Sequence, residues 1–438
     1  KNFSKDRDKL IVTKLTIKDV LAFEVLDSRG NPTVAAEVIL SDNSSSLAYV
    51  PSGASTGKHE ALELRDQDKS RFHGRGVLKA VNYINNEIKE LVIGHDPLDQ
   101  KAIDTNLCKA DGTDNKKAFG ANSILAISIA NLRASAAYKS VPLYQHIHSL
   151  NKEVYKASRT PTLPVPMLNI LNGGAHADNS IDFQEFMIQP LGFNTFKSAL
   201  RCGVEIFHEL KNLLKNKNFN TSVGDEGGFS PQLKTAEEAI ELILEAIKTS
   251  GYKAGKDVFL SLDPASSEFF QEGKYFFEGE NKLLDTEEMI SYLKTLTSKY
   301  PINSIEDGLH EDDWEGWKSL TKSLGSEVQL IGDDLFATNP KRIRRGIEEK
   351  VANSVLIKMN QIGTISETME AVSISQENGY KAVISHRSGE TEDTSISDLA
   401  IGLAAGQIKT GAPCRTDRVS KYNRLLILEQ KFKIPFIK

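Results

Sequence analysis

Short apolar runs recur through the second half of the chain, separated by segments of helical periodicity. The runs cover 258–262, 302–305, 328–332, 355–357, 382–384 and 407–408. From Glu306 onward, the residues that end successive runs are 23 to 28 residues apart, a spacing that fits one strand, one helix and two loops. Because such short apolar runs are typical of buried parallel strands, the pattern predicts alternating strands and helices.

A polar residue able to do chemistry follows each run. These residues are Asp263, Glu306, Asp333, Lys358, Ser385 with His386 and Arg387, and Lys409. The carboxyl ends of parallel strands in a closed barrel meet at one end, where such barrels keep their active sites. We therefore expect these side chains to gather at one end of a barrel, called the rim below.

The start of the second half differs from the repeats that follow it. Two apolar strands, 165–171 and 183–189, are joined by a loop too short for a crossover helix, which predicts antiparallel neighbours. Two helices follow at 195–215 and 235–249, the second opening with a capping box of Thr235 and Glu238. With six strand–helix units, this predicts a ββαα(βα)6 barrel of eight strands, similar to a TIM barrel.

The first half has a different pattern. Three short strands, at 20–26, 33–40 and 47–50, are separated by turn residues and predict a three-stranded antiparallel meander. Helices are predicted at 77–92, which has one apolar face, and at 121–137, which is apolar on nearly every face and therefore buried at a domain junction.

These two halves predict an α/β protein of two domains. The first is an α+β domain over 1–157, including an extra charged tail at 1–9, and the second is the barrel over 158–438. The length of 438 residues suits two domains. A net charge of −5 predicts no nucleic-acid partner, and no apolar stretch is long enough for membrane insertion. Three scattered cysteines suit a reducing, cytoplasmic location.

Asp263, Glu306 and Asp333 end three successive strands. Taken alone, each of these acids could have a structural role instead of a functional one, because an acid after a strand often caps the next helix. Three carboxylates on one rim repel one another, and a divalent cation removes that penalty. Oxygen ligands without cysteine or a histidine cluster favour Mg²⁺ over Zn²⁺.

Two lysines and an arginine end later strands. Burial lowers the pKa of a lysine at a rim, so Lys358 or Lys409 could act as a base; the alternative is a salt bridge to the acids opposite. Arg387, between hydroxyl-bearing Ser385 and Ser388, offers a planar fork suited to phosphate.

Other candidates are less defined by pattern. His386 and His176 are equally compatible with structural histidines. Glu185, in FQEF, ends its apolar run, and the pattern does not indicate whether its side chain points inward or outward. Glu226 lies in the glycine-rich VGDEGGFSP at 223–231, which suits either an acid–base group or a turn. The small and hydroxyl residues at 51–60 are compatible with binding of an anion or a metal, or with a plain surface loop.

Taken together, a Mg²⁺ site, a lysine base, an acidic loop and a phosphate-binding arginine at the rim suit one kind of reaction. They suit removal of a proton next to a carboxylate, with loss of a leaving group.

Ten short motifs, spread in order along the chain, resemble those of a known protein family. They are DSRGNPTV at 27–34, PSGASTG at 51–57, NGGAHA at 172–177, QEFM at 184–187, GDEGG at 224–228, SIED at 304–307, GDDL at 332–335, KMNQIGT at 358–364, SHRSGETED at 385–393 and IKTGAP at 408–413. Over about residues 15–429 the chain resembles the enolase family. The resemblance implies a lyase that converts 2-phospho-D-glycerate reversibly to phosphoenolpyruvate in glycolysis and gluconeogenesis.

Roles follow from the same resemblance. Asp263, Glu306 and Asp333 resemble the ligands of a first Mg²⁺, and Ser55 a ligand of a second Mg²⁺ that arrives with substrate. Lys358 resembles the base at C2, and Glu226, backed by Glu185, the acid at the C3 hydroxyl. The residues implied to contact substrate are His176, Gln184, Glu185, Glu306, Asp333, Ser385, His386, Arg387, Ser388 and Lys409; of these, His386 and Lys409 are also implied in catalysis.

The resemblance also implies a cytoplasmic homodimer or octamer, with a second pool at the cell surface or secreted. Pro264, after Asp263, departs from the small residue usual in the family; since it favours an extended Asp263, we expect ligation to survive. Two alternatives are another acid dehydratase or racemase of the superfamily, and a surface scaffold independent of catalysis. The loop at 51–57 and the SHRS segment argue against the first, because both suit a phosphorylated substrate.

Overall fold

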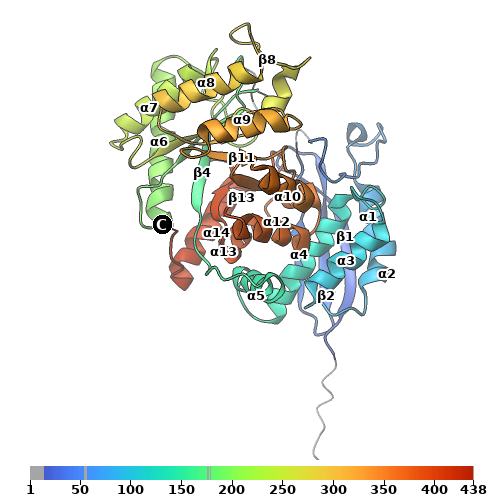
Figure 1. The fold of residues 1–438 in the computed structure, drawn as a ribbon. Coiled ribbons are helices and arrows are strands. Elements are labelled where there is room, and N and C mark those ends of the chain that lie inside the picture. Colours follow the sequence, from blue (N-terminus) through green and yellow to red (C-terminus); the bar gives the residue numbers. More distant parts are fainter. Residues whose placement is uncertain (1–13, 54–56, 175–176, 178, 438) are drawn as a thin grey trace, which may run out of the picture.

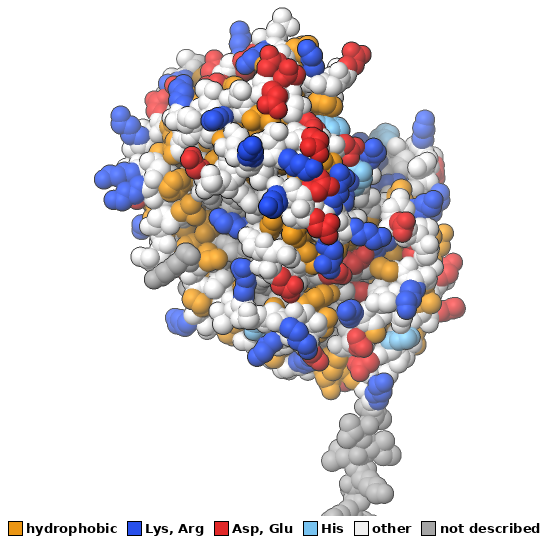
Figure 2. Space-filling view, in the orientation of Figure 1, with side chains coloured by type: hydrophobic (Ala, Val, Ile, Leu, Met, Phe, Trp, Pro, Cys, Tyr) orange, Lys and Arg blue, Asp and Glu red, His pale blue; other side chains and the backbone are white. Residues whose placement is uncertain are grey.

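The computed structural model describes residues 14–53, 57–174, 177 and 179–437. A three-stranded antiparallel sheet with helices is followed by a closed barrel of eight strands surrounded by helices (Figure 1). This confirms the predicted fold class. None of the helices in the described ranges is both long and apolar enough to cross a membrane. On the face shown in Figure 2, basic and acidic side chains are interspersed.

The N-terminal sheet is the predicted meander. Its strands are β1 (Ile17–Leu26), β2 (Pro32–Leu40) and β3 (Ser45–Tyr49), paired in that order. The turn between β1 and β2 is held by Asp27, whose Oδ1 accepts hydrogen bonds from the backbone amides of Arg29 and Asn31. Gly30 has a φ of 74° there, a conformation that favours glycine.

The helices of the N-terminal half differ from the predicted ones more than its strands do. The predicted helix at 77–92 is divided into α1 (Leu78–Tyr83), the π-helical turn η2 (Ile84–Ile88) and α2 (Lys89–Val92). The 3-10 turn η1 (Phe72–Gly74), α3 (Gln100–Asp111) and α5 (Leu143–Tyr155) were not predicted. The signals for α3 were present: Asp99 caps its first turn, and Gly112 ends it with a φ of 68°.

Helix α4 (Ala121–Tyr138) joins the two halves. It is buried along most of its length and packs against β2 and β3 on one side and α11 and α12 of the barrel on the other. In Figure 1 it lies between the N-terminal sheet and the barrel. The predicted burial of this helix is therefore confirmed. The division of domains at 157 stays a prediction; α5 ends at Tyr155, and the first barrel strand begins at Val165.

The barrel closes in the order β10-β11-β12-β13-β14-β4-β5-β6, and β5 is antiparallel to both its neighbours, as predicted. Its strands are β4 (Val165–Asn172), β5 (Glu185–Gln189), β6 (Phe259–Asp263), β10 (Ile302–Glu306), β11 (Gln329–Gly332), β12 (Ser354–Ile357), β13 (Lys381–Ser385) and β14 (Gly406–Lys409).

The helices of the barrel follow its strands in chain order. They are α6 (Phe196–Asn216), α7 (Ala236–Thr249), α8 (Thr286–Lys299), α9 (Trp314–Leu324), α10 (Pro340–Glu349), α11 (Met359–Ile362), α12 (Ile365–Glu377), α13 (Ser395–Gly402) and α14 (Thr416–Phe432). The 3-10 turn η4 (Ser266–Phe269) and a small sheet of β7 (Phe270–Gln271), β8 (Lys274–Phe277) and β9 (Lys282–Leu284) lie between β6 and α8. Because of this insertion, Asp263 and Glu306 are 43 residues apart, more than the residues that end the later strands.

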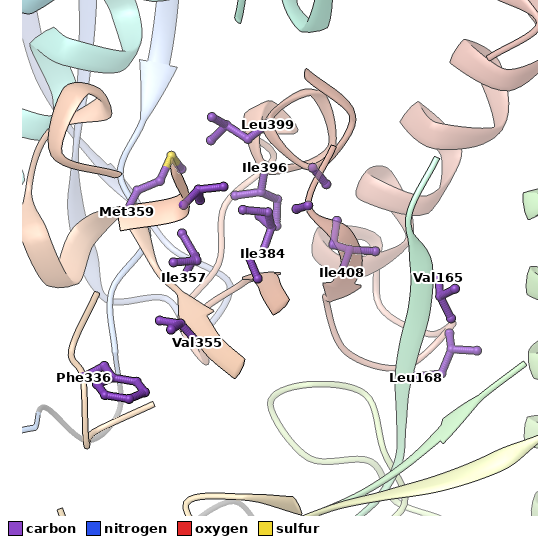
Figure 3. Packing of buried hydrophobic residues seen from close by; sticks show 14 of the residues in the cluster. Val165, Leu168, Phe336, Val355, Ile357, Met359, Ile384, Ile396, Leu399 and Ile408 are labelled. Carbon is purple, nitrogen blue, oxygen red and sulfur yellow. The ribbon is translucent and has the colours of Figure 1, made fainter. Parts of the chain in front are cut away.

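Strand residues alternate between the inside and outside of the barrel. Leu356 and Val383 belong to a small inner cluster with methionines of β4 and β5. Their neighbours Ile357 and Ile384 belong to the larger core between strands and helices, and Figure 3 shows Ile384 beside Ile396 of α13. This period of two aims successive side chains alternately inward and outward.

Candidate active site

A cavity opens at the carboxyl end of the barrel strands. It is lined by Glu60, Gln184, Glu185, Glu226, Asp263, Ala265, Glu268, Asp307, Asp333, Asp334, Lys358, Ser385, His386, Arg387, Ser388 and Lys409. Most of the residues predicted from strand ends and motifs are therefore brought together. Glu306 lies behind this lining, and its carboxylate accepts a hydrogen bond from Lys409. The predicted residues Ser55 and His176 lie outside the described residues.

The direction of β5 decides the orientation of Glu185, which sequence pattern left open. Because β5 runs opposite to its neighbours, its first residue lies where theirs end: Glu185 pairs with Asn172 of β4 and Asp263 of β6. The side chain points inward and is buried. An acid that begins an antiparallel strand thus reaches the same rim as acids that end parallel strands.

Lys409 is the centre of a buried charge cluster. Its Nζ lies 2.7 Å from Glu306 Oε1, 2.9 Å from Asp263 Oδ2 and 3.2 Å from Glu185 Oε1. Burial alone would lower the pKa of Lys409, but the surrounding carboxylates outweigh it and raise that pKa well above its usual value. Lys409 is therefore a fixed positive charge in this structure.

Lys358 is paired with Asp333, which follows the neighbouring strand β11. Its Nζ hydrogen-bonds Asp333 Oδ2, while Gln361 Nε2 donates to Asp333 Oδ1 at 2.8 Å. Burial is the largest effect and lowers the pKa of Lys358, yet the pKa is raised overall, chiefly by the neighbouring Asp333 carboxylate. The expectation of a lowered Lys358 pKa is therefore wrong in this structure, because the salt bridge left open as an alternative is present.

The carboxylates are more numerous than the cations that face them. Burial and the neighbouring Asp263 raise the pKa of Glu306 well above its usual value, and Glu306 Oε2 has no hydrogen-bond partner among the described residues. Ligand atoms of Asp307, Asp333 and Asp334 lie within 4.8 Å of one another. This excess of buried hard oxygens fits a divalent cation such as Mg²⁺.

The predicted ligands Asp263, Glu306 and Asp333 share only Asp333 with the cluster of Asp307, Asp333 and Asp334. In that cluster, Asp307 is poorly suited to bind a metal. Its Oδ1 and Oδ2 already accept hydrogen bonds from the amides of Asp333 and Asp334, at 2.9 and 2.8 Å. It therefore holds the loop after β11 in place. Pro264 does not displace Asp263, whose Oδ1 accepts a hydrogen bond from the Ala265 amide at 2.9 Å and whose side chain lines the cavity.

Glu226 faces His386 in the cavity. Glu226 Oε2 accepts a hydrogen bond from Asn169 Nδ2 at 2.9 Å and lies 3.4 Å from His386 Nε2. Burial lowers the pKa of His386 to about 4, so its imidazole is neutral near pH 7. Gly227 allows the loop to fit here, since it has a φ of 87° and a Cβ would lie 2.7 Å from the Cys414 carbonyl oxygen.

Arg387 forms an ion pair with Glu60, an acid that was not predicted from the sequence. Its Nη1 donates to Glu60 Oε2 and to Asn360 Oδ1, each at 2.9 Å, and its Nη2 donates to Glu60 Oε1 at 3.2 Å. Glu60 belongs to the N-terminal half and ends the loop at 51–60 that composition had singled out. Asp307 and Asp334 also line the cavity; each directly follows a predicted ligand at a strand end, but no sequence pattern assigned either of them a role.

These acids predict how stability depends on pH in buffer without divalent cations. The pKa values of Glu306, Asp307 and Asp334 are all raised in the folded protein, by burial and by neighbouring carboxylates. The folded state then binds more protons than the unfolded chain, so these groups stabilise it below the usual carboxyl range and lose that contribution as pH rises through their raised values. Urea unfolding across pH should show this fall, and Glu306→Gln should show a smaller one.

Comparison with protein families covers both halves of the chain. A family model described as the enolase N-terminal domain matches residues 17–147, and one described as the enolase C-terminal TIM barrel domain matches residues 160–434. These matches coincide with the observed sheet-and-helix half and with the barrel that holds the cavity. The chain therefore belongs to the enolase family.

Proposed function

We propose that this protein is a phosphopyruvate hydratase, a lyase that interconverts 2-phospho-D-glycerate and phosphoenolpyruvate plus water and depends on Mg²⁺. The observation that carries the proposal is the meeting, in one cavity, of a lysine, an opposing glutamate, a fixed ammonium and a guanidinium fork: Lys358, Glu226, Lys409 and Arg387. These groups match the needs of proton removal beside a carboxylate, departure of a hydroxyl, and retention of a phosphate.

Lys358 is proposed as the base that takes the C2 proton onto Nζ. In the present structure Asp333 holds that nitrogen protonated. Ligation by Asp333 would withdraw this charge, after which burial, Arg387 and Lys409 all lower the pKa of Lys358. Asp333 would thus both bind the metal and control the pKa of the base Lys358.

The metal ligands are proposed to be Asp263, Glu306 and Asp333, with Ser55, outside the described residues, for a second ion. The unpartnered Glu306 Oε2 and the repulsion among these acids support this set. Bound Mg²⁺ supplies positive charge that stabilises the dianion formed when the C2 proton leaves. Lys409, held by Asp263, Glu306 and Glu185, adds a fixed charge for the substrate carboxylate.

Glu226 is proposed as the acid that protonates the departing C3 hydroxyl, with Glu185 behind it. Burial, together with the neighbouring Glu226 carboxylate, raises the pKa of Glu185 well above its usual value. Arg387, Ser388 and His386 would hold the phosphate, and Gln184 and Ser385 line the same cavity. The proposal includes a homodimer, or an octamer, located in the cytoplasm.

The test adds 2-phosphoglycerate and Mg²⁺ to the purified protein and follows the ultraviolet absorbance of the enol phosphate. Absorbance should rise with Mg²⁺ and remain unchanged when a chelator is in excess. Non-phosphorylated 2-hydroxy acids, tested in parallel, distinguish the proposed function from another acid dehydratase or racemase of the superfamily. Turnover of those acids alone, or full turnover with excess chelator, would contradict the proposal.

A further inference from the structure

A fully buried arginine lies behind the cavity and has no role in the proposed mechanism. Arg418, near the start of α14, is 0% exposed. A guanidinium removed from water costs free energy unless its donors are satisfied. Its Nε lies 2.7 Å from the carboxylate of Asp417, an ion pair without the geometry of a hydrogen bond. Gly411 packs closely against its alkyl chain, since a Cβ there would lie 2.8 Å from Arg418 Cδ.

The two terminal nitrogens of Arg418 connect two loops of the cavity. Nη1 donates to the Arg387 carbonyl oxygen at 2.6 Å, and Nη2 donates to the carbonyl oxygens of Ser388 at 2.6 Å and Asp225 at 3.2 Å. One rigid fork therefore holds the segment before Gly389 and the segment that contains Glu226. A planar group with fixed donors suits this task better than a flexible ammonium.

Nη1 of Arg418 also lies within hydrogen-bond distance of His386 Nδ1. A guanidinium carries donors only, so Nδ1 must be the acceptor in this contact. A neutral imidazole has one protonated nitrogen, and burial keeps His386 neutral by lowering its pKa to about 4. The proton of His386 is therefore on Nε2, the nitrogen that lies 3.4 Å from Glu226 Oε2.

We propose that Arg418 is a positioning residue that fixes His386 in the tautomer protonated at Nε2 and so aims an N–H at Glu226. Glu226 Oε2 then accepts a hydrogen bond from Asn169 Nδ2, and His386 Nε2–H lies 3.4 Å from the same oxygen, an electrostatic contact longer than a hydrogen bond. The inference rests on the proposed function for the catalytic role of Glu226, whereas the tautomer itself can be measured without turnover.

The experiment labels the histidine imidazoles with ¹⁵N and identifies the tautomer from long-range ¹H–¹⁵N correlations, with His386→Gln to assign the signal. In the wild-type protein we expect His386 to be neutral and protonated at Nε2. Arg418→Met, which removes the donors, should populate the Nδ1-protonated form and lower kcat by about 10- to 100-fold, the range for loss of an orienting partner, with a smaller change in KM. Arg418→Lys, which retains a donor, should restore the wild-type tautomer.

Arg424→Met is the matched control. Arg424 lies on the same helix and pairs with Asp398 through Nε and Nη2, each at 2.8 Å, away from the cavity. It should leave the His386 signal and kcat unchanged. A wild-type His386 protonated at Nδ1 would overturn the proposal even if Arg418→Met fails to fold. An unchanged tautomer in folded Arg418→Met would do so too, whatever its activity. If the protein does not act on 2-phosphoglycerate, the proposed function fails while the tautomer measurement still decides this inference.

Discussion

Replacing Lys358 by alanine is expected to abolish exchange of the substrate C2 proton with solvent, whereas Glu226→Gln should keep exchange and stop dehydration. Lys358 follows β12, and Glu226 is held by Asn169 of β4, three strands further round the barrel. The two groups can therefore act on opposite sides of a bound substrate. Loss of a general acid or base lowers turnover by about 10²- to 10⁴-fold.

The measurement is deuterium incorporation into unreacted 2-phosphoglycerate in heavy water with Mg²⁺. Lys381→Ala is the matched control, because Lys381 begins β13, is exposed, and lies at the end of the barrel remote from the cavity. It should retain both exchange and dehydration. Equal loss of exchange in the Lys358 and Glu226 variants would show that the two roles are assigned wrongly.

The barrel could be predicted because its signal is local and repeated. Each of the six later strands is a short apolar run followed by a polar residue, so both the strand and the direction of its functional end can be recognised in the sequence. The antiparallel β5 followed from the short loop before it. Asp263, Asp333, Lys358 and Lys409 came from the same reasoning, which needs only strand order and the rule that carboxyl ends of parallel strands meet.

Other features depend on contacts that no local pattern encodes. Glu60 reaches Arg387 from the other half of the chain, and Arg418 reaches His386 from the first turn of α14. The pKa of Lys358 depends on whether Asp333 is 2.5 Å away, which spacing along the sequence does not determine. Tertiary pairing thus sets both the electrostatics of the rim and the identity of its supporting residues.

Replacing Lys409 by methionine should combine loss of turnover with a large loss of stability in buffer without divalent cations. The change leaves the carboxylates of Asp263, Glu306 and Glu185 facing one another without their shared ammonium. Removing one partner of a buried ion pair typically costs about 3–5 kcal/mol of unfolding free energy. Because the acids would then bind protons more tightly in the folded state, the variant should regain stability as pH falls.

Lys421→Met separates a general cost of burying unpaired charge from a cost specific to the proposed metal site. Lys421 is 0% exposed and pairs with Glu390 at 2.9 Å, and Glu390 does not line the cavity. Urea unfolding with and without Mg²⁺ should show both variants destabilised, but only Lys409→Met strongly restabilised by the ion, since a divalent cation can replace the missing ammonium among its three acids. Equal stabilisation of both variants by Mg²⁺ would contradict a cation site at Asp263 and Glu306.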